Sequence, residues 1–323
     1  MKRTSVIGIA ALCLLTSGPV CSTQTTSQPS PALWTVDAKT PEGLKNLLRH
    51  DGQSLHLVSA HRGGAGKGLP ENCIATFENT LRHTHAMMEV DPRYTKDGVI
   101  VLHHDPTLER TTNGTGRVVD RTWEELKALR LKDAAGVLTE YSIPTLDEAL
   151  QWARGKTILV LDQKDVPVEA RARKVAEHNA EAYAVLIVYS FADAQRCYAM
   201  NPHVMMEVMI PNAEQVAAFD RTGVPWSNIV AFVGHSPPQE PQLCEMIHTR
   251  GASCMGGTSR NIDRLLIERQ VTDVNDLRRQ YRALLDMGID LIETDLPREV
   301  GPLLYGRHPV PASRAPFLQS GPR

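Results

Sequence analysis

The sequence lacks the features that mark several large classes of protein. It has no block of basic residues and a formal net charge of −2, so no surface is expected to release counterions from a nucleic-acid backbone. Beyond the N-terminal residues, no apolar stretch approaches the roughly 20 residues that a membrane span needs. Six cysteines are present without a C-x-x-C pair, which argues against zinc. We therefore expect neither a nucleic-acid partner nor a stable membrane span.

The N-terminus has the composition of an export signal. Two basic residues follow Met1, an apolar run extends from Val6 to Leu15, and Gly18-Pro19 would break a helix. Basic, apolar and small residues in this order are typical of a secretory signal that is too short to span a bilayer. We place the signal at residues 1–22 and expect a periplasmic or secreted protein. A lipid anchor at Cys21 is the less favoured alternative, because the residues before it match the usual lipoprotein signal poorly.

The remainder of the 323-residue chain is long enough for one large barrel domain. Apolar residues make up 42% of the sequence, which is sufficient for a large core. We expect a polar tether and an N-terminal helix over residues 23–50, a barrel over 51–310 and a tail over 311–323. In an oxidising compartment a disulfide between Cys244 and Cys254 is compatible with the sequence, although spacing alone does not fix the pairing.

Short β-rich segments alternate with helix-like segments along this domain. Most are continuous apolar runs, as in parallel strands that are covered on both faces. Helix starts are indicated by Thr40-Pro41 and by capping boxes at Thr122 with Glu125 and Thr145 with Glu148. Repeated βα units predict an α/β fold closed into a TIM-type (β/α)8 barrel. The runs cover residues 55–60, 86–91, 99–104, 157–162, 183–190, 204–210, 229–234, 252–257 and 289–295.

These nine runs are one more than an eight-stranded barrel needs. The connection between Asp91 and Val99 reads PRYTKDG, which is too short for the crossover helix that joins parallel strands. We therefore expect one run to lie outside the barrel or to pack irregularly against it.

Polar residues gather at the C-terminal ends of the first four runs. In a barrel these ends share the face on which active sites are built. Four consecutive strands would then bring histidines, carboxylates and cations into one cleft. The residues are His61 and Arg62 at the first run, Glu89 and Asp91 at the second, His104 at the third, and Asp162 and Lys164 at the fourth.

Three of these carboxylates suit a cation. Glu89 and Asp91 lie two apart on one strand, so their side chains share a face, and Asp162 arrives from a neighbouring strand. Ligands that are all oxygen favour a hard ion, Mg²⁺ or Ca²⁺, over zinc.

The other polar residues suit proton transfer and phosphate binding. His61 and His104 titrate in the range that a general acid and a general base need near neutral pH. The planar guanidinium of Arg62 can donate two hydrogen bonds to a phosphate, and the ammonium of Lys164 adds a localised positive charge. A metal, two histidines and two cations together indicate phosphodiester chemistry, in which the transition state gathers negative charge on the phosphoryl oxygens.

The sequence resembles the glycerophosphodiester phosphodiesterase family, whose barrel is related to that of phosphatidylinositol phospholipase C. The resemblance implies metal-dependent hydrolysis of a glycerophosphodiester, a small molecule, to sn-glycerol 3-phosphate and an alcohol. It also implies His61 and His104 as the catalytic pair and Glu89, Asp91 and Asp162 as the metal ligands. The matching segments are HRGGAGKGLPEN (61–72), EVDPRYTKDGVIVLHHDPTLERTTNGTG (89–116), IPTLDEAL (143–150) and GIDLIETDLP (288–297).

Two parts of the sequence depart from the family's pattern, and two glutamates each have two possible roles. Asp162 stands where the family usually has a glutamate, and the segment CMGGTSRN (254–261) lacks the usual tryptophan, which leaves the specificity for the alcohol open. Glu71 is interpreted either as a hydrogen-bond partner of Arg62 or as a metal ligand. Glu293 either accepts a hydrogen bond at the barrel mouth or binds a substrate hydroxyl or a metal-bound water.

Two alternatives belong to other functional classes. One is a phospholipase D-like or C-like enzyme that acts on a lysophospholipid or a sphingolipid with the same barrel. The other is a barrel that binds phosphoesters without catalysis. The complete set of histidines and carboxylates and the stretch HHDPTLERTTNG favour the glycerophosphodiesterase. The sequence carries no signal of oligomeric state.

Overall fold

The computed structural model describes residue 1 and residues 32–53, 55–268, 274–305, 310–319 and 321. Residues 2–22 of the predicted signal, including Cys21, and most of the predicted tether lie outside the described residues. No helix in the described part of the chain is both long enough and apolar enough to cross a membrane.

Eight parallel strands close into a barrel, which confirms the predicted TIM-type fold. Neighbouring strands pair in the order β10-β11-β2-β3-β6-β7-β8-β9. Residues of these strands are almost all buried, because the barrel interior covers one face and the helices cover the other. The strands are β2 (Leu57–Ala60), β3 (Ala86–Val90), β6 (Leu159–Leu161), β7 (Ala184–Val188), β8 (Met205–Met209), β9 (Ile229–Gly234), β10 (Ser253–Gly257) and β11 (Leu291–Thr294).

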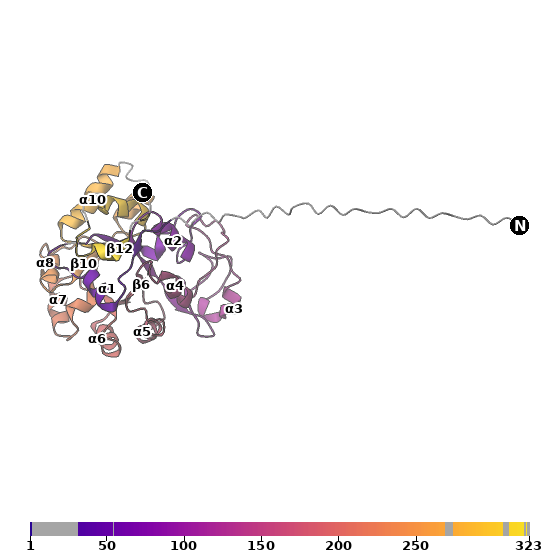
Figure 1. The fold of residues 1–323 in the computed structure, drawn as a ribbon, viewed down its shortest axis with the longest axis horizontal. Coiled ribbons are helices and arrows are strands. Elements are labelled where there is room, and N and C mark those ends of the chain that lie inside the picture. Colours follow the sequence, from indigo (N-terminus) through magenta and orange to yellow (C-terminus); the bar gives the residue numbers. More distant parts are fainter. Residues whose placement is uncertain (2–31, 54, 269–273, 306–309, 320, 322–323) are drawn as a thin grey trace. The chain divides into compact units, whose positions relative to one another are not determined.

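Helices follow the strands and surround them (Figure 1). The predicted capping boxes are present: Thr122 caps α3 (Trp123–Leu126) and Thr145 caps α4 (Leu146–Ala153). Each threonine accepts from the backbone N–H of the glutamate three residues on, which satisfies a donor that the helix leaves free. The other helices of this layer are α2 (Ile74–Leu81), α5 (Val168–Glu177), α6 (Phe191–Met200), α7 (Ala213–Asp220), α8 (Leu243–His248), α9 (Ile262–Ile267), α10 (Val274–Asp286) and α11 (Pro297–Tyr305).

The surplus ninth run lies outside the barrel, as expected. Residues Ile100–Leu102 form β5, which pairs antiparallel with β4 (Pro92–Tyr94) in a separate two-stranded sheet. A small core of its own, which includes Val101, Leu108 and Leu126, supports this insertion. The expectation that four consecutive barrel strands deliver the polar residues is therefore corrected: three barrel strands and this hairpin do so.

The N-terminal end of the barrel is closed by α1 (Pro41–Leu48), which Thr40 caps as predicted. Leu44, Leu47 and Leu48 of this helix pack against the inward residues of the strands, such as Leu57 and Met205. Apolar side chains thus fill the centre of the barrel at this end, and the predicted site residues lie at the opposite end. Beside α1, β1 (Thr35–Val36) pairs antiparallel with β12 (Leu318–Gln319) of the last described segment.

Arg314 fastens this last segment to α1. Its side chain is 1% exposed and donates to the carbonyl oxygens of Leu47 (3.1 Å) and Arg49 (2.9 Å) and to Asp51 (2.9 Å). One guanidinium therefore satisfies carbonyl oxygens at the C-terminal end of the helix that have no partner within it.

Replacing Arg314 by alanine should lower the free energy of unfolding by about 3 kcal/mol, because it removes three hydrogen bonds of a buried guanidinium and leaves the carbonyl oxygen of Leu47 buried without this partner. Arg49→Ala is the matched control, since Arg49 reaches the same Asp51 at 3.8 Å from a half-exposed position and such pairs contribute less than about 1 kcal/mol. Urea denaturation of both variants measures the difference. Equal losses would show that the buried bonds of Arg314 do not fasten the segment.

Candidate active site

A cavity of about 970 Å³ opens at the carboxyl ends of the barrel strands. Its wall contains all but one of the residues that the sequence predicted for a site. The exception is Asp91, which is 1% exposed and contacts two of the lining residues, Arg62 and Lys164. The predicted residues that line the cavity are His61, Arg62, Glu71, Glu89, His104, Asp162, Lys164 and Glu293.

Three buried carboxylates converge in this cavity wall. Glu89 and Asp91 come from the end of β3 and Asp162 follows β6, the next strand of the barrel. Their ligand oxygens all lie within 4.8 Å of one another. Burial, together with the negative charges of Asp91, Glu293 and Asp162, raises the pKa of Glu89 well above its usual range. Buried carboxylates that repel one another in this way fit a divalent cation, and their oxygens suit Mg²⁺ or Ca²⁺.

The glycine-rich bend after β2 holds two of these carboxylates in place. The backbone N–H of Arg62 donates to Glu89 Oε2 at 2.8 Å, and Arg62 has the left-handed φ of 52°. Asn72 and Asp91 exchange two hydrogen bonds, of 2.6 and 3.0 Å. Gly63 follows with a φ of 85°, and a Cβ there would lie 2.2 Å from the Phe77 ring. Glycine is therefore required where the bend packs against α2.

Asp162 is held by groups on both sides. Lys164 forms ion pairs with Asp162 and, at 3.0 Å, with Asp91. Tyr189, at the end of β7, donates its hydroxyl to Asp162 Oδ1 at 2.6 Å. Burial alone would raise the pKa of Asp162, but Lys164 and the Tyr189 hydrogen bond outweigh it and lower the pKa. Asp162 therefore stays ionised beside Glu89.

His61 is paired with an acid from the last strand of the barrel. Its Nδ1 lies 2.6 Å from Oδ1 of Asp295, directly after β11. Burial would lower the pKa of His61, but the hydrogen bond to Asp295 and the charges of Glu293 and Asp295 outweigh burial and raise the pKa. His61 is therefore biased toward its protonated form.

His104 lies in the opposite electrostatic setting. It follows β5, with Nδ1 2.7 Å from Oδ1 of Asp105. Burial, aided by the positive charges of Arg62 and Lys164, lowers the pKa of His104 despite the carboxylates of Asp91 and Asp105. The imidazole is thus biased toward its neutral form. The preceding His103 faces away, with Nε2 3.0 Å from the carbonyl oxygen of Thr107, as the alternation of strand side chains predicts.

Glu71 belongs to an ion-pair network that orders the phosphate-binding candidates. It accepts from Arg62 at 3.2 Å and from Arg110 at 2.7 and 2.8 Å, and Arg110 also binds Asp105. Of its two interpretations, the structure places Glu71 as the partner of Arg62 and shows it outside the carboxylate cluster. Arg110 extends the chain of contacts from Arg62 to His104.

The cavity wall also contains residues that were not predicted as site residues. Tyr189, Glu207 and His235 all line the cavity, and Oε2 of Glu207 is buried without a hydrogen-bond partner in the described part of the chain. His235 lies with Nδ1 4.0 Å from Oε1 of Glu293. Each residue lies within or just after an apolar run, so the strand-end rule that found the other residues also applies to these later strands.

Fold and site together define a class of protein: a (β/α)8 barrel with a carboxylate cluster suited to a divalent cation and two histidine–carboxylate pairs at the carboxyl ends of its strands. Within this class, the chain belongs to the glycerophosphoryl diester phosphodiesterase family, whose profile matches residues 61–299. The match includes every residue of the carboxylate cluster and both histidines.

Solved structures and curated relatives agree with this assignment. A glycerophosphoryl diester phosphodiesterase from Parabacteroides distasonis is 43% identical with a TM-score of 0.84, and the match covers 89% of this chain and 99% of that one. A glycerophosphodiester phosphodiesterase from Caldanaerobacter subterraneus subsp. tengcongensis is 34% identical over 161 residues, which is 47% of this chain and 66% of that protein. The chain spans just under two thirds of the length of such curated relatives.

A more distant structure shares the fold. A phosphodiesterase from Oleispira antarctica in complex with the product sn-glycerol-3-phosphate is 21% identical with a TM-score of 0.57, and the match covers 77% of this chain and 97% of that one.

The pKa of His61 should be higher than the pKa of His104, because their surroundings shift the two values in opposite directions. Proton NMR of the imidazole resonances should give a pKa above the usual value of about 6.5 for His61 and below it for His104. Asp295→Asn removes the negative partner and should lower the pKa of His61 while leaving that of His104 in place. The account fails if His104 titrates at the higher pH or if Asp295→Asn leaves His61 unchanged.

Proposed function

We propose that the protein hydrolyses glycerophosphodiesters to sn-glycerol 3-phosphate and an alcohol. The observation that carries the proposal is the convergence, in one cavity, of three buried carboxylates with two histidines of opposite pKa shift and two cations. Membership of the family and the names of the relatives support the reaction class. The glycerol 3-phosphate product in the Oleispira antarctica structure supports the identity of the retained half.

The carboxylate cluster is proposed to hold one divalent cation. Glu89, Asp91 and Asp162 would be its ligands, and Mg²⁺ and Ca²⁺ both match their oxygens. When bound, the cation would withdraw charge from the phosphoryl oxygens. The mutual repulsion of the carboxylates supports this assignment.

Arg62 and Lys164 are proposed to bind the phosphate. Both line the cavity and both already contact Asp91, so a phosphate that binds them lies beside the carboxylate cluster. Nε of Arg62 lies 3.8 Å from Oδ2 of Asp91 and makes no hydrogen bond among the described groups, so the protein does not use the full hydrogen-bonding capacity of this guanidinium.

The two histidines are proposed to divide the proton transfers. His104, whose pKa is lowered, is biased toward its neutral form and can accept a proton from the attacking water as a general base. His61, whose pKa is raised, keeps its proton and can donate it to the leaving alcohol as a general acid. Activity should then rise with pH as His104 loses its proton and fall as His61 loses its own.

Export stays a proposal that rests on the sequence. The basic, apolar and small residues of positions 1–22 support a signal peptide, and the protein would then meet its substrates in a periplasm or outside the cell.

Both histidines should be necessary for turnover. His61→Gln and His104→Gln should each lower the rate by on the order of 10²-fold or more, because each removes one proton transfer. His103→Gln is the control: it alters the neighbouring histidine, which faces away from the cavity. Phosphorus NMR with mixed glycerophosphodiesters and a lysophospholipid measures the rates and identifies the products. Near-normal turnover by His61→Gln or by His104→Gln would contradict the two-histidine mechanism. Release of a phosphorylated head group or of a lipid phosphate would favour the phospholipase alternative.

Asp162→Asn should weaken binding of Mg²⁺ or Ca²⁺ by at least about tenfold, because it removes a charged ligand while keeping the side-chain size. Asp165→Asn is the matched control, since Asp165 lies three residues further on and pairs instead with Arg93 at 3.0 Å. Isothermal calorimetry on protein stripped of metal gives both affinities. Unchanged affinity in Asp162→Asn would move the third ligand to another carboxylate, such as Glu293.

A further inference from the structure

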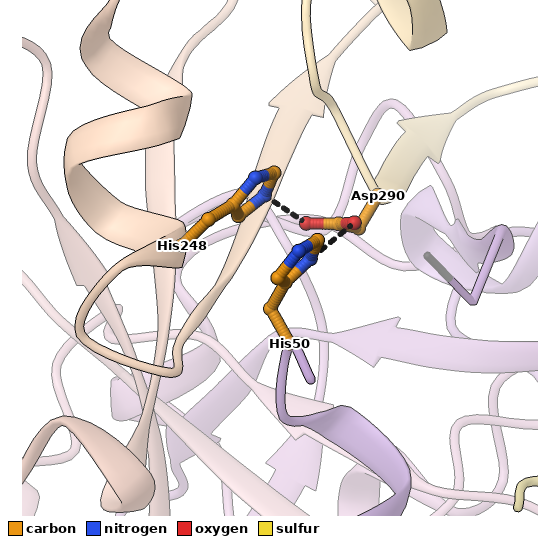
Figure 2. Close-up of side chains that lie close together, drawn as sticks. All are labelled: His50, His248 and Asp290. Carbon is orange, nitrogen blue, oxygen red and sulfur yellow. Dashed lines mark hydrogen bonds and ion pairs between the residues drawn. The ribbon is translucent and has the colours of Figure 1, made fainter. Parts of the chain in front are cut away.

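A second cluster of metal-ligating side chains lies at the other end of the barrel. His50 follows α1, His248 is the last residue of α8, and Asp290 directly precedes β11 (Figure 2). All three therefore belong to the N-terminal ends of the strands, away from the carboxyl ends that form the proposed active site. The family profile includes Asp290 and His248 but begins after His50.

The three side chains converge on one point. Nδ1 of His50 lies 3.3 Å from Oδ1 of Asp290, and Nε2 of His248 lies 2.7 Å from Oδ2. The two imidazole rings are stacked, with centroids 3.6 Å apart and planes within 5° of parallel. One ligand atom of each residue lies within 4.8 Å of those of the other two.

The buried acid of this cluster is held by two histidines and a backbone N–H. Asp290 is completely buried, yet within the described ranges no lysine or arginine forms an ion pair with it, and only the two histidines do. The adjoining cavity wall adds two further acids, Glu245 and Asp286. A buried carboxylate in such surroundings favours a bound cation.

The cluster is both open to solvent and held in place. A cavity of about 500 Å³ reaches it and is lined by His50, His248 and Cys244. Gly288 keeps this cavity clear, because a Cβ there would lie 2.8 Å from Cβ of Cys244 and 3.4 Å from Cε1 of His248. The backbone N–H of Cys254 donates to Oδ2 of Asp290 at 2.8 Å, which fixes the carboxylate as supporting hydrogen bonds do in metal sites.

We propose that His50, His248 and Asp290 bind one divalent transition-metal ion, with Zn²⁺ as the best match. Two imidazoles and a carboxylate are a ligand set for zinc, and a fourth position open to a cavity can take water. Ligands of a tetrahedral zinc ion lie roughly 3.3–3.6 Å apart, which the separation of His50 and Asp290 already matches. The ion would replace the two hydrogen bonds to Asp290, and the rings would turn toward it from their stacked arrangement.

The site would differ from the proposed active site in its metal and in its role. Nitrogen ligands select Zn²⁺ over the Mg²⁺ or Ca²⁺ that an all-oxygen cluster prefers. Because its ligands come from three distant segments, the ion would tie the end of α1 and the end of α8 to the start of β11. We therefore expect zinc to raise the thermal stability of the protein without being required for hydrolysis.

The test counts zinc bound to the full-length protein in the presence of excess Mg²⁺, which would compete for the proposed site at the carboxylate cluster. Wild-type protein should retain one zinc equivalent that His50→Gln and His248→Gln each weaken by more than about tenfold. His178→Gln is the control, because His178 forms a comparable pair with Asp147 at 2.6 Å that Lys174 already compensates. Metal analysis after gel filtration and thermal melts with and without Zn²⁺ give the two readouts.

Nitrogen NMR of the wild-type imidazoles supplies a measurement that depends on no variant. Added Zn²⁺ should shift Nδ1 of His50 and Nε2 of His248 and leave the ring of His178 unaffected. Equal zinc retention and equal melting shifts in wild type and both variants, or unchanged resonances of His50 and His248, would overturn the proposal. The cluster would then be a hydrogen-bonded histidine pair around a buried acid.

Discussion

The crowding of carboxylates at one end of the barrel is the constraint on which the rest of the site depends. Below them the barrel interior is filled with aliphatic and aromatic side chains, so inward-facing acids on β3, β8 and β11 and after β6 are removed from water. Burial and mutual repulsion raise the pKa values of Glu89, Glu207 and Glu293. Lys164 and Arg62 offset part of this charge, and a divalent cation would offset more of it. The proposed reaction depends on this excess of negative charge, because it would hold a cation next to the phosphate of the substrate.

The two histidines reach this cluster by different structural means. His61 lies at the end of a barrel strand, where a left-handed residue and glycines turn the chain sharply enough for a backbone N–H to bind Glu89. His104 comes from a hairpin outside the barrel, and its position depends on the ion pairs that connect Arg110 to Asp105 and Glu71. Neighbouring acids outweigh burial at His61, whereas burial and the nearby cations outweigh the acids at His104, so the two histidines acquire opposite protonation preferences.

Much of this architecture could be predicted from the sequence because it depends on local patterns. Continuous apolar runs, capping boxes and polar residues at strand ends identify the barrel, its helix starts and the carboxylate cluster. The short PRYTKDG connection even indicates that one run lies outside the barrel. Contacts between distant segments leave no such pattern: Asp295 beside His61, Arg110 beside Glu71 and Arg314 beneath α1 join residues whose pairing only the closed fold determines. Tyr189, Glu207 and His235 were accessible to the same strand-end argument, applied to the later strands.

The central claim is that the carboxylate cluster acts by holding a cation against the phosphate of the substrate. Calorimetric titration of metal-free protein with sn-glycerol 3-phosphate, in the presence of Mg²⁺ or Ca²⁺ and then of a chelator, tests it most directly. The account predicts binding with the cation and a loss of at least about tenfold in affinity without it, because the unscreened carboxylates repel the phosphate. Equal affinity in the chelator would contradict the account and leave Arg62 and Lys164 to bind the phosphate alone.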